Sequence, residues 1–290
     1  MKKKVVQKTL DNPFDIRDGR AMVSLGPLSQ KKYCSYSCPF CYVNAGFLSY
    51  ATMTIAETVE WLKSHAGDFN IIYVSGDTDS FAPPRTDQGI ELLEAVGKFD
   101  VDLLFTTRAL FEEKHLRRIK EIRDSLSKRG KLMFGCVSVA QLNHPALEPE
   151  PIASPLQRIA QLEKFKVLGL VSVLAMRPFL PVVPVEEYLK LVSLVAGKVD
   201  SVLGEVWYAD QTGILEGAVF SKYKSTGMDF VESEMDFDDN ESIWRVYESK
   251  EVEIAVSEKC AEMNIPFFMR SSAAVSWARK KTKGHSNDLH

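Results

Sequence analysis

Residues 34–42 read Cys34-Ser35-Tyr36-Ser37-Cys38-Pro39-Phe40-Cys41-Tyr42, which places three cysteines at the spacing C-x3-C-x2-C. A loop this short can wrap one metal cluster with three thiolates, and soft thiolate ligands favour zinc or an iron–sulfur cluster. Structural zinc sites are normally closed by four protein ligands. The nearest histidine after the triplet, His65, lies beyond a predicted helix. Three thiolates with one open position therefore favour a [4Fe–4S] cluster whose fourth iron binds another ligand. The expected metal ligands are Cys34, Cys38 and Cys41.

The composition is that of an ordinary globular protein, with 290 residues, of which 45% are hydrophobic and 26% charged. No apolar run approaches the ~18 residues of a membrane span. No apolar segment follows the basic start Met1–Lys4, so we expect a cytoplasmic protein without a secretion signal or a membrane contact. The other two cysteines, Cys136 and Cys260, cannot build a second cluster, and we expect both to be buried as small hydrophobic residues.

The net charge is −3, with an isoelectric point of about 6.0. Basic residues concentrate at 117–129, which we interpret as a solvated helix face, and at 279–283, which we interpret as a terminal tail. A protein that follows many phosphates usually carries a basic stripe. Charge therefore gives no support to a nucleic acid partner, which stays an alternative.

Short apolar runs alternate with helical patterns along the chain. We predict strands at 21–25, 71–74, 103–106, 132–139, 171–176 and 202–207, with a shorter one at 265–268. We predict helices at 55–65, 87–96, 113–129, 156–168, 185–195, 242–263 and 273–281. Ser154 before Pro155 is typical of a helix start. The acidic segment 228–241 has no clear period, and we expect it to be a surface excursion. About six β-α repeats predict a parallel sheet with right-handed crossovers.

Polar residues follow several predicted strands, where parallel α/β barrels bind ligands. After the second strand, residues 75–79 combine Gly76, which lets a ligand approach the backbone, with three oxygen-bearing side chains. These residues would also suit an Asx-type turn. Arg108, after the third strand, can pair bidentately with a carboxylate or form a surface ion pair. Ser138, on the fourth strand, can bond a ligand hydroxyl or the backbone.

The cysteine loop resembles that of the radical S-adenosylmethionine (radical SAM) superfamily. In that superfamily, the amino and carboxylate groups of SAM chelate the open iron, and one electron splits SAM into methionine and a 5′-deoxyadenosyl radical. The resemblance implies an α/β fold, a partial (β/α)6 TIM-type barrel, over residues 1–210. Periodicity alone would also allow a full barrel or an open sheet. Residues 211–290 are expected to form a C-terminal helical extension that packs on the barrel and shapes the substrate pocket.

A second segment narrows the resemblance. Residues 147–158 contain Glu-Pro-Glu-Pro and Ser-Pro-x-x-Arg, which resembles a segment of the spore photoproduct lyase-like branch. The Thr-Asp within 76–79 and the run 177–181 are similar to the same branch, so the resemblance covers roughly residues 33–184. The chain departs from true lyases at Gly76, where they carry a hydrogen-donating cysteine. This departure puts repair of spore photoproduct in doubt.

The resemblance implies roles for individual residues. Phe40 would pack on the adenine of SAM, residues 75–79 would meet its amino group, and Ser138 would bond its ribose. Arg108 is a candidate for the SAM carboxylate. Arg158 would reach the same carboxylate or pair with a nearby glutamate, and the doubled Glu-Pro leaves Glu148 and Glu150 as alternatives. The full expected SAM-binding set is Phe40, Tyr42, Ser75, Gly76, Asp77, Thr78, Asp79, Arg108, Ser138, Glu150 and Arg158.

The substrate site is less specified. Arg177 and Trp207 end predicted strands and are expected to contact substrate, and Arg177 would suit an anionic group. Tyr208 or Asp210 could transfer a proton or a hydrogen atom. We therefore expect a radical SAM enzyme that abstracts hydrogen from a small molecule and is reduced by a flavodoxin or ferredoxin. The alternatives are an enzyme that modifies a nucleic acid base or lesion, and a non-catalytic iron–sulfur electron carrier or binding protein.

Overall fold

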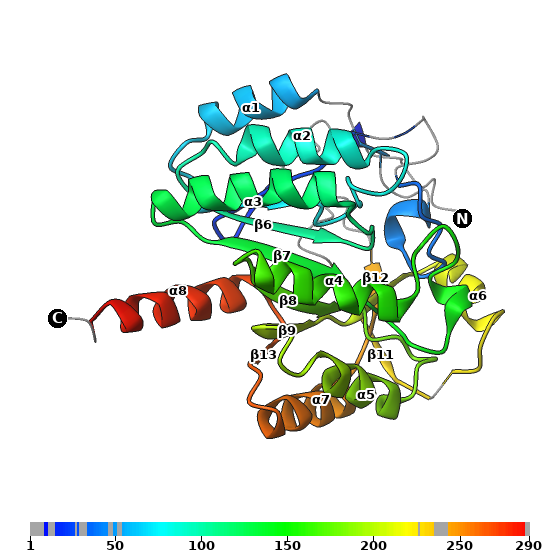
Figure 1. Ribbon diagram of the computed structural model, residues 1–290. Coiled ribbons are helices and arrows are strands. Elements are labelled where there is room, and N and C mark those ends of the chain that lie inside the picture. The colour runs from blue at the N-terminus through cyan, green and yellow to red at the C-terminus, as the bar shows by residue number, and fades with distance from the viewer. Residues whose placement is uncertain are drawn as a thin grey trace.

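The structure, a computed structural model, describes residues 9–10, 15–26, 28, 34–45, 49–50, 54–225, 227–234 and 243–287. Its centre is a curled sheet of eight strands in the order β13-β9-β8-β7-β6-β5-β3-β2 (Figure 1). All neighbouring strands are parallel except the antiparallel pair of β2 and β3. The strands are β2 Asp15–Arg17, β3 Arg20–Val23, β5 Ile71–Val74, β6 Asp102–Thr107, β7 Met133–Ser138, β8 Val171–Met176, β9 Ser201–Gly204 and β13 Phe267–Phe268. This partial barrel confirms the expected fold class.

Helices connect the parallel strands and cover the outer face of the sheet. In Figure 1, α1, α2 and α3 lie together on this outer face, and α7 lies beside α5. The helices are α1 Ile55–Ser64, α2 Thr86–Val96, α3 Glu113–Lys128, α4 Pro155–Val167, α5 Val185–Val195, α6 Ile214–Phe220, α7 Lys250–Glu262 and α8 Ser271–Asn287. Two short 3-10 helices, Tyr42–Ala45 and Pro145–Leu147, and a parallel strand pair of β1 Thr9–Leu10 and β4 Ser49–Tyr50 complete the described elements.

Two hydrophobic cores lie on the two faces of the curled sheet. In β5, Ile72 and Val74 belong to the outer core, under the helices, whereas Ile71 and Tyr73 belong to the inner core. This is the alternation that a strand imposes on successive side chains. The inner core is closed by three residues of α8, which therefore fills the concave side of the sheet. They are Ala274, Val275 and Ala278.

The C-terminal segment contributes to the sheet itself. β13, within residues 211–290, pairs in parallel with β9 and forms one edge of the sheet. Directly after β13, the Ser271 hydroxyl accepts a hydrogen bond from Nη1 of Arg20 on β3, at 2.6 Å. This bond joins segments near the two edges of the curled sheet. Among the described helices, none has the length and apolar character needed to cross a membrane.

Two of the sequence-based expectations are wrong in this half of the chain. The strand expected at 202–207 ends at Gly204, and β10 Trp207–Asp210 belongs to a separate antiparallel sheet with β12 Ile243–Tyr247 and β11 Phe230–Glu234. The helix expected at 242–263 begins only at Lys250, because the aromatic and β-branched run 243–247 favours a strand. The segment 228–241, expected to be a surface excursion, contains the exposed strand β11, and its residues 235–241 lie outside the described part.

Candidate functional site

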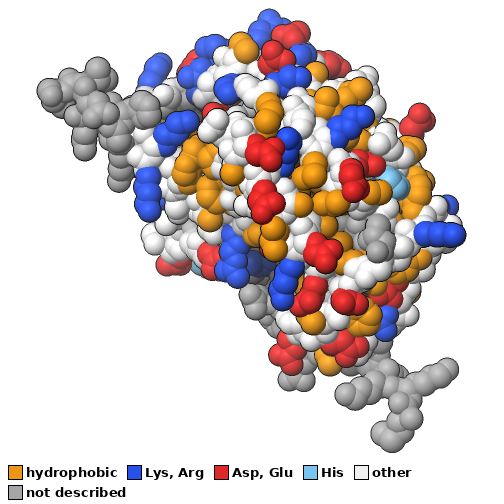
Figure 2. Space-filling view, turned by 90° about the horizontal axis from the view of Figure 1, so that it is seen from below, with side chains coloured by type: hydrophobic (Ala, Val, Ile, Leu, Met, Phe, Trp, Pro, Cys, Tyr) orange, Lys and Arg blue, Asp and Glu red, His pale blue; other side chains and the backbone are white. Residues whose placement is uncertain are grey.

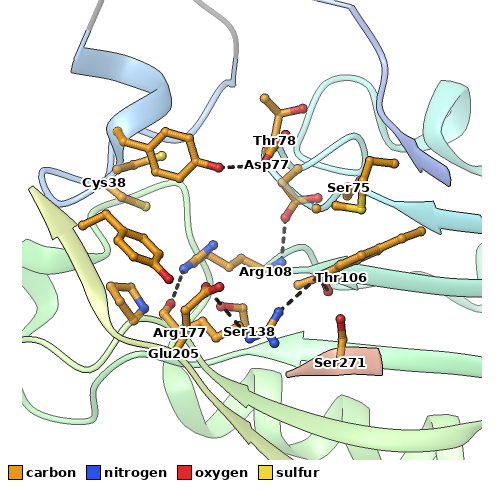
Figure 3. A pocket seen from close by; sticks show the side chains of 18 of the residues that line it. Cys38, Ser75, Asp77, Thr78, Thr106, Arg108, Ser138, Arg177, Glu205 and Ser271 are labelled. Carbon is orange, nitrogen blue, oxygen red and sulfur yellow. Dashed lines mark hydrogen bonds and ion pairs between the residues drawn. The ribbon is translucent and has the colours of Figure 1, made fainter. Parts of the chain in front are cut away.

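A cavity of about 690 Å³ lies where the strands of the partial barrel end (Figure 3). It is the location that parallel α/β barrels use for their ligands. The cysteine loop, the loop after β5, the ends of β6, β7 and β8, and the start of β10 all contribute to its wall. Most of the predicted site residues line this cavity. They are Cys34, Cys38, Phe40, Cys41, Tyr42, Ser75, Gly76, Asp77, Thr78, Asp79, Arg108, Ser138, Arg177, Trp207 and Tyr208.

The three clustered thiols face this one cavity. Cys34 and Cys38 are buried, Cys41 is half-buried, and none of them forms a disulfide. A backbone hydrogen bond from Cys41 N to Cys38 O turns the loop. The indole Nε1 of Trp207 donates to the carbonyl of Phe40 at 3.0 Å and ties the loop to β10. Burial raises the pKa of the Cys34 and Cys38 thiols, and the nearby Arg108 acts in the opposite direction by favouring their thiolate forms.

The three cysteines are donors of the kind that hold an iron–sulfur cluster. A four-iron cluster binds each thiolate through a different iron, so its sulfur ligands lie farther apart than those of one ion. Three thiols on one loop around a shared cavity therefore fit three corners of a [4Fe–4S] cluster.

The loop after β5 is held in a fixed shape by its own side chains. Ser75 adopts a left-handed conformation, with φ of 65°, and its Oγ accepts a hydrogen bond from Ser80 N at 3.0 Å. Asp79 accepts bonds from Phe81 N at 3.0 Å and from Arg108 N at 2.6 Å, and its burial raises its pKa. Asp79 is therefore occupied in joining this loop to the end of β6.

The same loop holds one buried side-chain oxygen that has no hydrogen-bond partner among the described residues. The Asp77 carboxylate accepts a hydrogen bond from the Tyr42 hydroxyl at 2.6 Å. By contrast, Thr78 is 7% exposed, and its Oγ1 has no hydrogen-bond partner among the described residues. Buried hydroxyls normally find a partner, so an unpaired one on a residue that lines the cavity is a candidate ligand contact. The orphaned Thr78 oxygen fits the amino group of SAM, which the sequence resemblance places at this loop.

A buried glutamate holds two arginines at the base of the cavity wall. Glu148 Oε1 accepts from Arg108 Nε at 2.9 Å, and its Oε2 accepts from Arg158 Nη2 at 2.5 Å. Burial disfavours the Glu148 charge, but Arg158 and Arg108 together lower its pKa to about 2. Gln141 adds a further hydrogen bond at 3.2 Å. The Glu148 carboxylate is thus charged, and both of its oxygens accept hydrogen bonds from neighbouring side chains.

Arg108 is the member of this cluster that reaches the cavity. Burial opposes its charge, but Cys38 and Glu148 raise its pKa, so it remains cationic. Its Nη2 donates to the carbonyl of Arg177 at 3.2 Å, and its guanidinium lies 5.7 Å from the centre of the Phe40 ring. A fixed positive charge therefore lies beside the cysteine loop, where an anionic ligand group can pair with it.

Three predicted residues are not brought to the cavity. Arg158 is fully buried under the wall, and Glu150 is exposed, so it is Glu148 that pairs with Arg158. Asp210 caps α6, accepting from Leu215 N at 2.7 Å and Ile214 N at 3.0 Å. Asp210 therefore does not lie where it could transfer a proton or a hydrogen atom to a ligand in the cavity.

Other residues line the cavity that sequence analysis did not single out. Tyr73 points inward from β5, and its hydroxyl is 2.8 Å from Thr106 Oγ1. Strand alternation could have placed Tyr73 on the inner face. Arg20 and Ser271 carry no local signal, because they come together only when the two ends of the sheet meet. The additional lining residues include Tyr36, Tyr73, Thr106, Thr107, Glu205, Arg20 and Ser271.

Comparisons with known proteins give structural similarity alone. No family model and no curated protein matches the sequence. A spore photoproduct lyase double mutant with bound AdoMet and dinucleoside spore photoproduct matches 93% of this chain and 81% of its own, with 13% identity and a TM-score of 0.58. The lyase complexed with dinucleoside spore photoproduct matches 86% and 82%, with 13% identity and the same TM-score of 0.58.

A solved radical SAM protein is also similar. The radical SAM methyltransferase TsrM from Kitasatospora setae, with tryptophan and a SAM analogue bound, matches 85% of this chain and 52% of its own, with 12% identity and a TM-score of 0.50. At these identities, the likeness shows the fold alone. The chain thus has the fold of spore photoproduct lyase, which confirms the expected resemblance at the level of architecture.

Proposed function

We propose that this protein is a radical SAM enzyme in which Cys34, Cys38 and Cys41 hold a [4Fe–4S] cluster. The observation that carries this proposal is the shared cavity: it is lined by the three cysteines, by Thr78, whose hydroxyl has no hydrogen-bond partner among the described residues, and by the cationic Arg108. When bound, the cluster would supply the electron that splits SAM into methionine and a 5′-deoxyadenosyl radical. The fold likeness to enzymes of this kind supports the same assignment.

The residues of the chain would bind and orient SAM beside the cluster. Arg108 is positioned to pair with its carboxylate, and the loop 75–79, through Thr78, would accept a hydrogen bond from its amino group. Phe40 would lie along the adenine, and Ser138, which is buried on the cavity wall, would bond the ribose. The Tyr42–Asp77 hydrogen bond keeps the cysteine loop and the loop after β5 together.

The proposed substrate is a small molecule held in the rest of the cavity, close to the reactive end of SAM. Arg177, Trp207 and Tyr208 line that part and would contact it. The reaction type stays open among lyase, oxidoreductase and transferase chemistry. A flavodoxin or ferredoxin would supply the electron.

A second candidate is modification of a nucleic acid base or lesion, because the similar solved lyases bind a dinucleoside lesion. Two observations weigh against it. Gly76 offers no thiol, and the space a Cβ would take there is filled by Met22, 2.2 Å away. The net charge of −3 gives this candidate no support, and on the face seen from below in Figure 2 basic side chains lie scattered among acidic and apolar ones. A non-catalytic iron–sulfur carrier is a third candidate, but it would have no use for the SAM-facing groups.

The test is anaerobic reconstitution with iron and sulfide, reduction with dithionite, and detection of 5′-deoxyadenosine formed from SAM. We expect wild-type protein to bind about four irons and to form 5′-deoxyadenosine, and Cys34→Ala to lose both. Cys260→Ala is the matched control, because this buried thiol lies on α7, away from the cavity. A full SAM-cleaving cluster in Cys34→Ala would refute the proposal.

A further inference from the structure

The cavity is bounded on one side by the cysteine loop and on the opposite side by Ser271 at the start of α8, which we call the floor of the cavity. Helix α8 begins at Ser271, on the cavity, and its next turns fill the inner core beneath it. Figure 3 shows Cys38 and Ser271 on opposite sides of the cavity, with Thr106 and Arg177 between Cys38 and the floor. The start of a 17-residue helix therefore faces the cavity with its partial positive charge.

Several guanidinium groups gather at this floor. Arg17 and Arg20 come from the β2–β3 hairpin, and Arg177 comes from the end of β8, and all three line the cavity. Burial lowers the pKa of Arg20, and although Asp18 raises it, Arg177 and Arg17 lower it further. Charges influence each other in this way only at short range, so the three cations form a cluster.

Among the described residues, the carboxylates nearest to Arg20 and Arg177 are partly exposed. Asp18 is 3.3 Å from Arg20, but its side chain is 57% exposed. Glu205 comes no closer than 4.0 Å to Arg177 and is 40% exposed. Solvent screens such pairs strongly. Arg108 shows the contrast, because a fully buried glutamate holds it at 2.9 Å.

Arg177 also has unused hydrogen-bonding capacity. Its Nε has no hydrogen bond among the described residues and lies 4.0 Å from Glu205 Oε2, and its Nη1 makes only a long contact of 3.5 Å with the Tyr73 hydroxyl. Arg20, in contrast, is held in place by the Ser271 hydroxyl at 2.6 Å and by the carbonyl of Arg17 at 3.1 Å. One fixed and one open guanidinium beside a helix start can together hold an oxyanion through charge-assisted bonds.

We propose that the floor of the cavity is an oxyanion subsite, formed by Arg20, Arg177, Ser271 and the start of α8, which binds a carboxylate or phosphate group of the substrate. The proposal rests on the proposed function for the identity of the cavity as a substrate site. It adds an orientation: the anionic group lies at the α8 end, and the carbon that reacts faces the cysteine loop. The substrate class is thus a small organic acid or phosphate ester.

The subsite is tested by anaerobic titration calorimetry of the cluster-loaded protein with inorganic phosphate and, separately, with acetate. We expect binding of at least one of them, weakened about tenfold or more in Arg177→Gln and in Arg20→Gln. Arg177→Lys keeps the charge but loses the planar fork, so we expect an intermediate affinity. Arg117→Gln, an exposed change of the same charge on α3, is the control and should bind like wild type. The probe that binds more tightly indicates whether the anionic group of the substrate is a phosphate or a carboxylate.

The outcomes separate the subsite from the enzyme assignment. Equal affinity in Arg177→Gln, Arg20→Gln and Arg117→Gln, or no binding of either probe to wild type, overturns the subsite. The SAM-cleavage assay on wild-type protein tests the enzyme assignment independently. Arginine-dependent phosphate or acetate binding without any 5′-deoxyadenosine formation would leave the subsite standing and refute the radical SAM function.

Discussion

Glu148 is the residue on which the cationic side of the site depends. Its carboxylate is fully buried and bridges Arg108, which faces the cavity, to Arg158, which does not. Removing one partner of a buried ion pair leaves an uncompensated charge in a place that water cannot reach. The position of Arg108 is therefore set by a residue that never touches the ligand.

We predict that Glu148→Gln destabilises the protein by about 3–5 kcal/mol, because it leaves two buried guanidinium groups without their counterion. The free energy of unfolding in urea measures this loss. Glu150→Gln is the matched control: the same change two positions away, on an exposed side chain, should stay within about 0.5 kcal/mol of wild type. Equal stability of the two variants would show that Glu148 does not hold the arginines.

The same carboxylate makes stability depend on pH. Its pKa is lowered from an ordinary 4.5 to about 2, so the folded state binds the proton less readily than the unfolded state does. The stabilisation is complete above about pH 4.5 and is lost as the pH falls towards 2, a loss on the order of 3 kcal/mol. We expect the free energy of unfolding of wild-type protein, measured in urea, to fall through this pH window. For Glu148→Gln, we expect this free energy to depend less steeply on pH. Parallel pH profiles would contradict the assignment.

At this scale, the sequence was informative where a pattern is local. The cysteine spacing predicted three thiols around one cavity, and they line it. The choice between Glu148 and Glu150 could not be made from sequence, because each precedes a proline in the same short repeat. Burial separates them, and burial depends on how α4 docks against the sheet.

Among the elements, α4 shows how local signals position a distant charge. Ser154 caps this helix: its Oγ accepts from Gln157 N, and the Gln157 side chain accepts from Ser154 N at 3.1 Å. The cap fixes the first turn, and Arg158 lies in the next one. The predicted start at Ser154 and Pro155 is confirmed, because a capping box needs only neighbouring residues.

We predict that Ser154→Ala lowers the free energy of unfolding by about 1 kcal/mol, because it removes the capping hydrogen bond at the start of α4. Ser154→Gly should lower the free energy of unfolding by only a few tenths of a kcal/mol. Thermal or urea unfolding measures both. Ser125→Ala, an exposed serine inside α3, serves as control and should be nearly neutral. An alanine variant as stable as wild type would mean that the cap is not needed to start the helix.

The elements that sequence analysis missed depend on contacts outside their own segments. β12 forms a strand because β10 and β11 pair with it on either side, whereas its sequence runs directly into a helical pattern. β10 separates from β9 after Gly204, where a Cβ would collide with Phe179, 2.6 Å away. Neither partner can be identified from a window of a few residues.

For the whole molecule, α8 decides how the partial barrel is closed. Its apolar side fills the inner core, its first residue forms the cavity floor, and Arg279, in the middle of the helix, pairs with Asp102 at 2.6 Å. The sequence predicted a helix here, but its basic residues suggested a tail. That interpretation was wrong for Arg279, because the pairing spans 177 positions and leaves no local trace.

We predict that Arg279→Gln destabilises the protein by about 2 kcal/mol, because Asp102, whose side chain is 3% exposed, would lose its charged partner. Lys280→Gln, the exposed neighbour, is the control and should change stability by less than about 0.5 kcal/mol. Urea unfolding distinguishes the two. If both variants matched wild type, α8 would not be anchored through this ion pair.

The most direct test of the central claim is an EPR spectrum of the reconstituted, dithionite-reduced wild-type protein, recorded anaerobically with and without SAM. If the three cysteines leave one iron open for SAM, the spectrum of the reduced cluster must change when SAM is added. An assembled cluster whose spectrum is identical with and without SAM would contradict the claim and would leave the protein as an iron–sulfur carrier on a radical SAM fold.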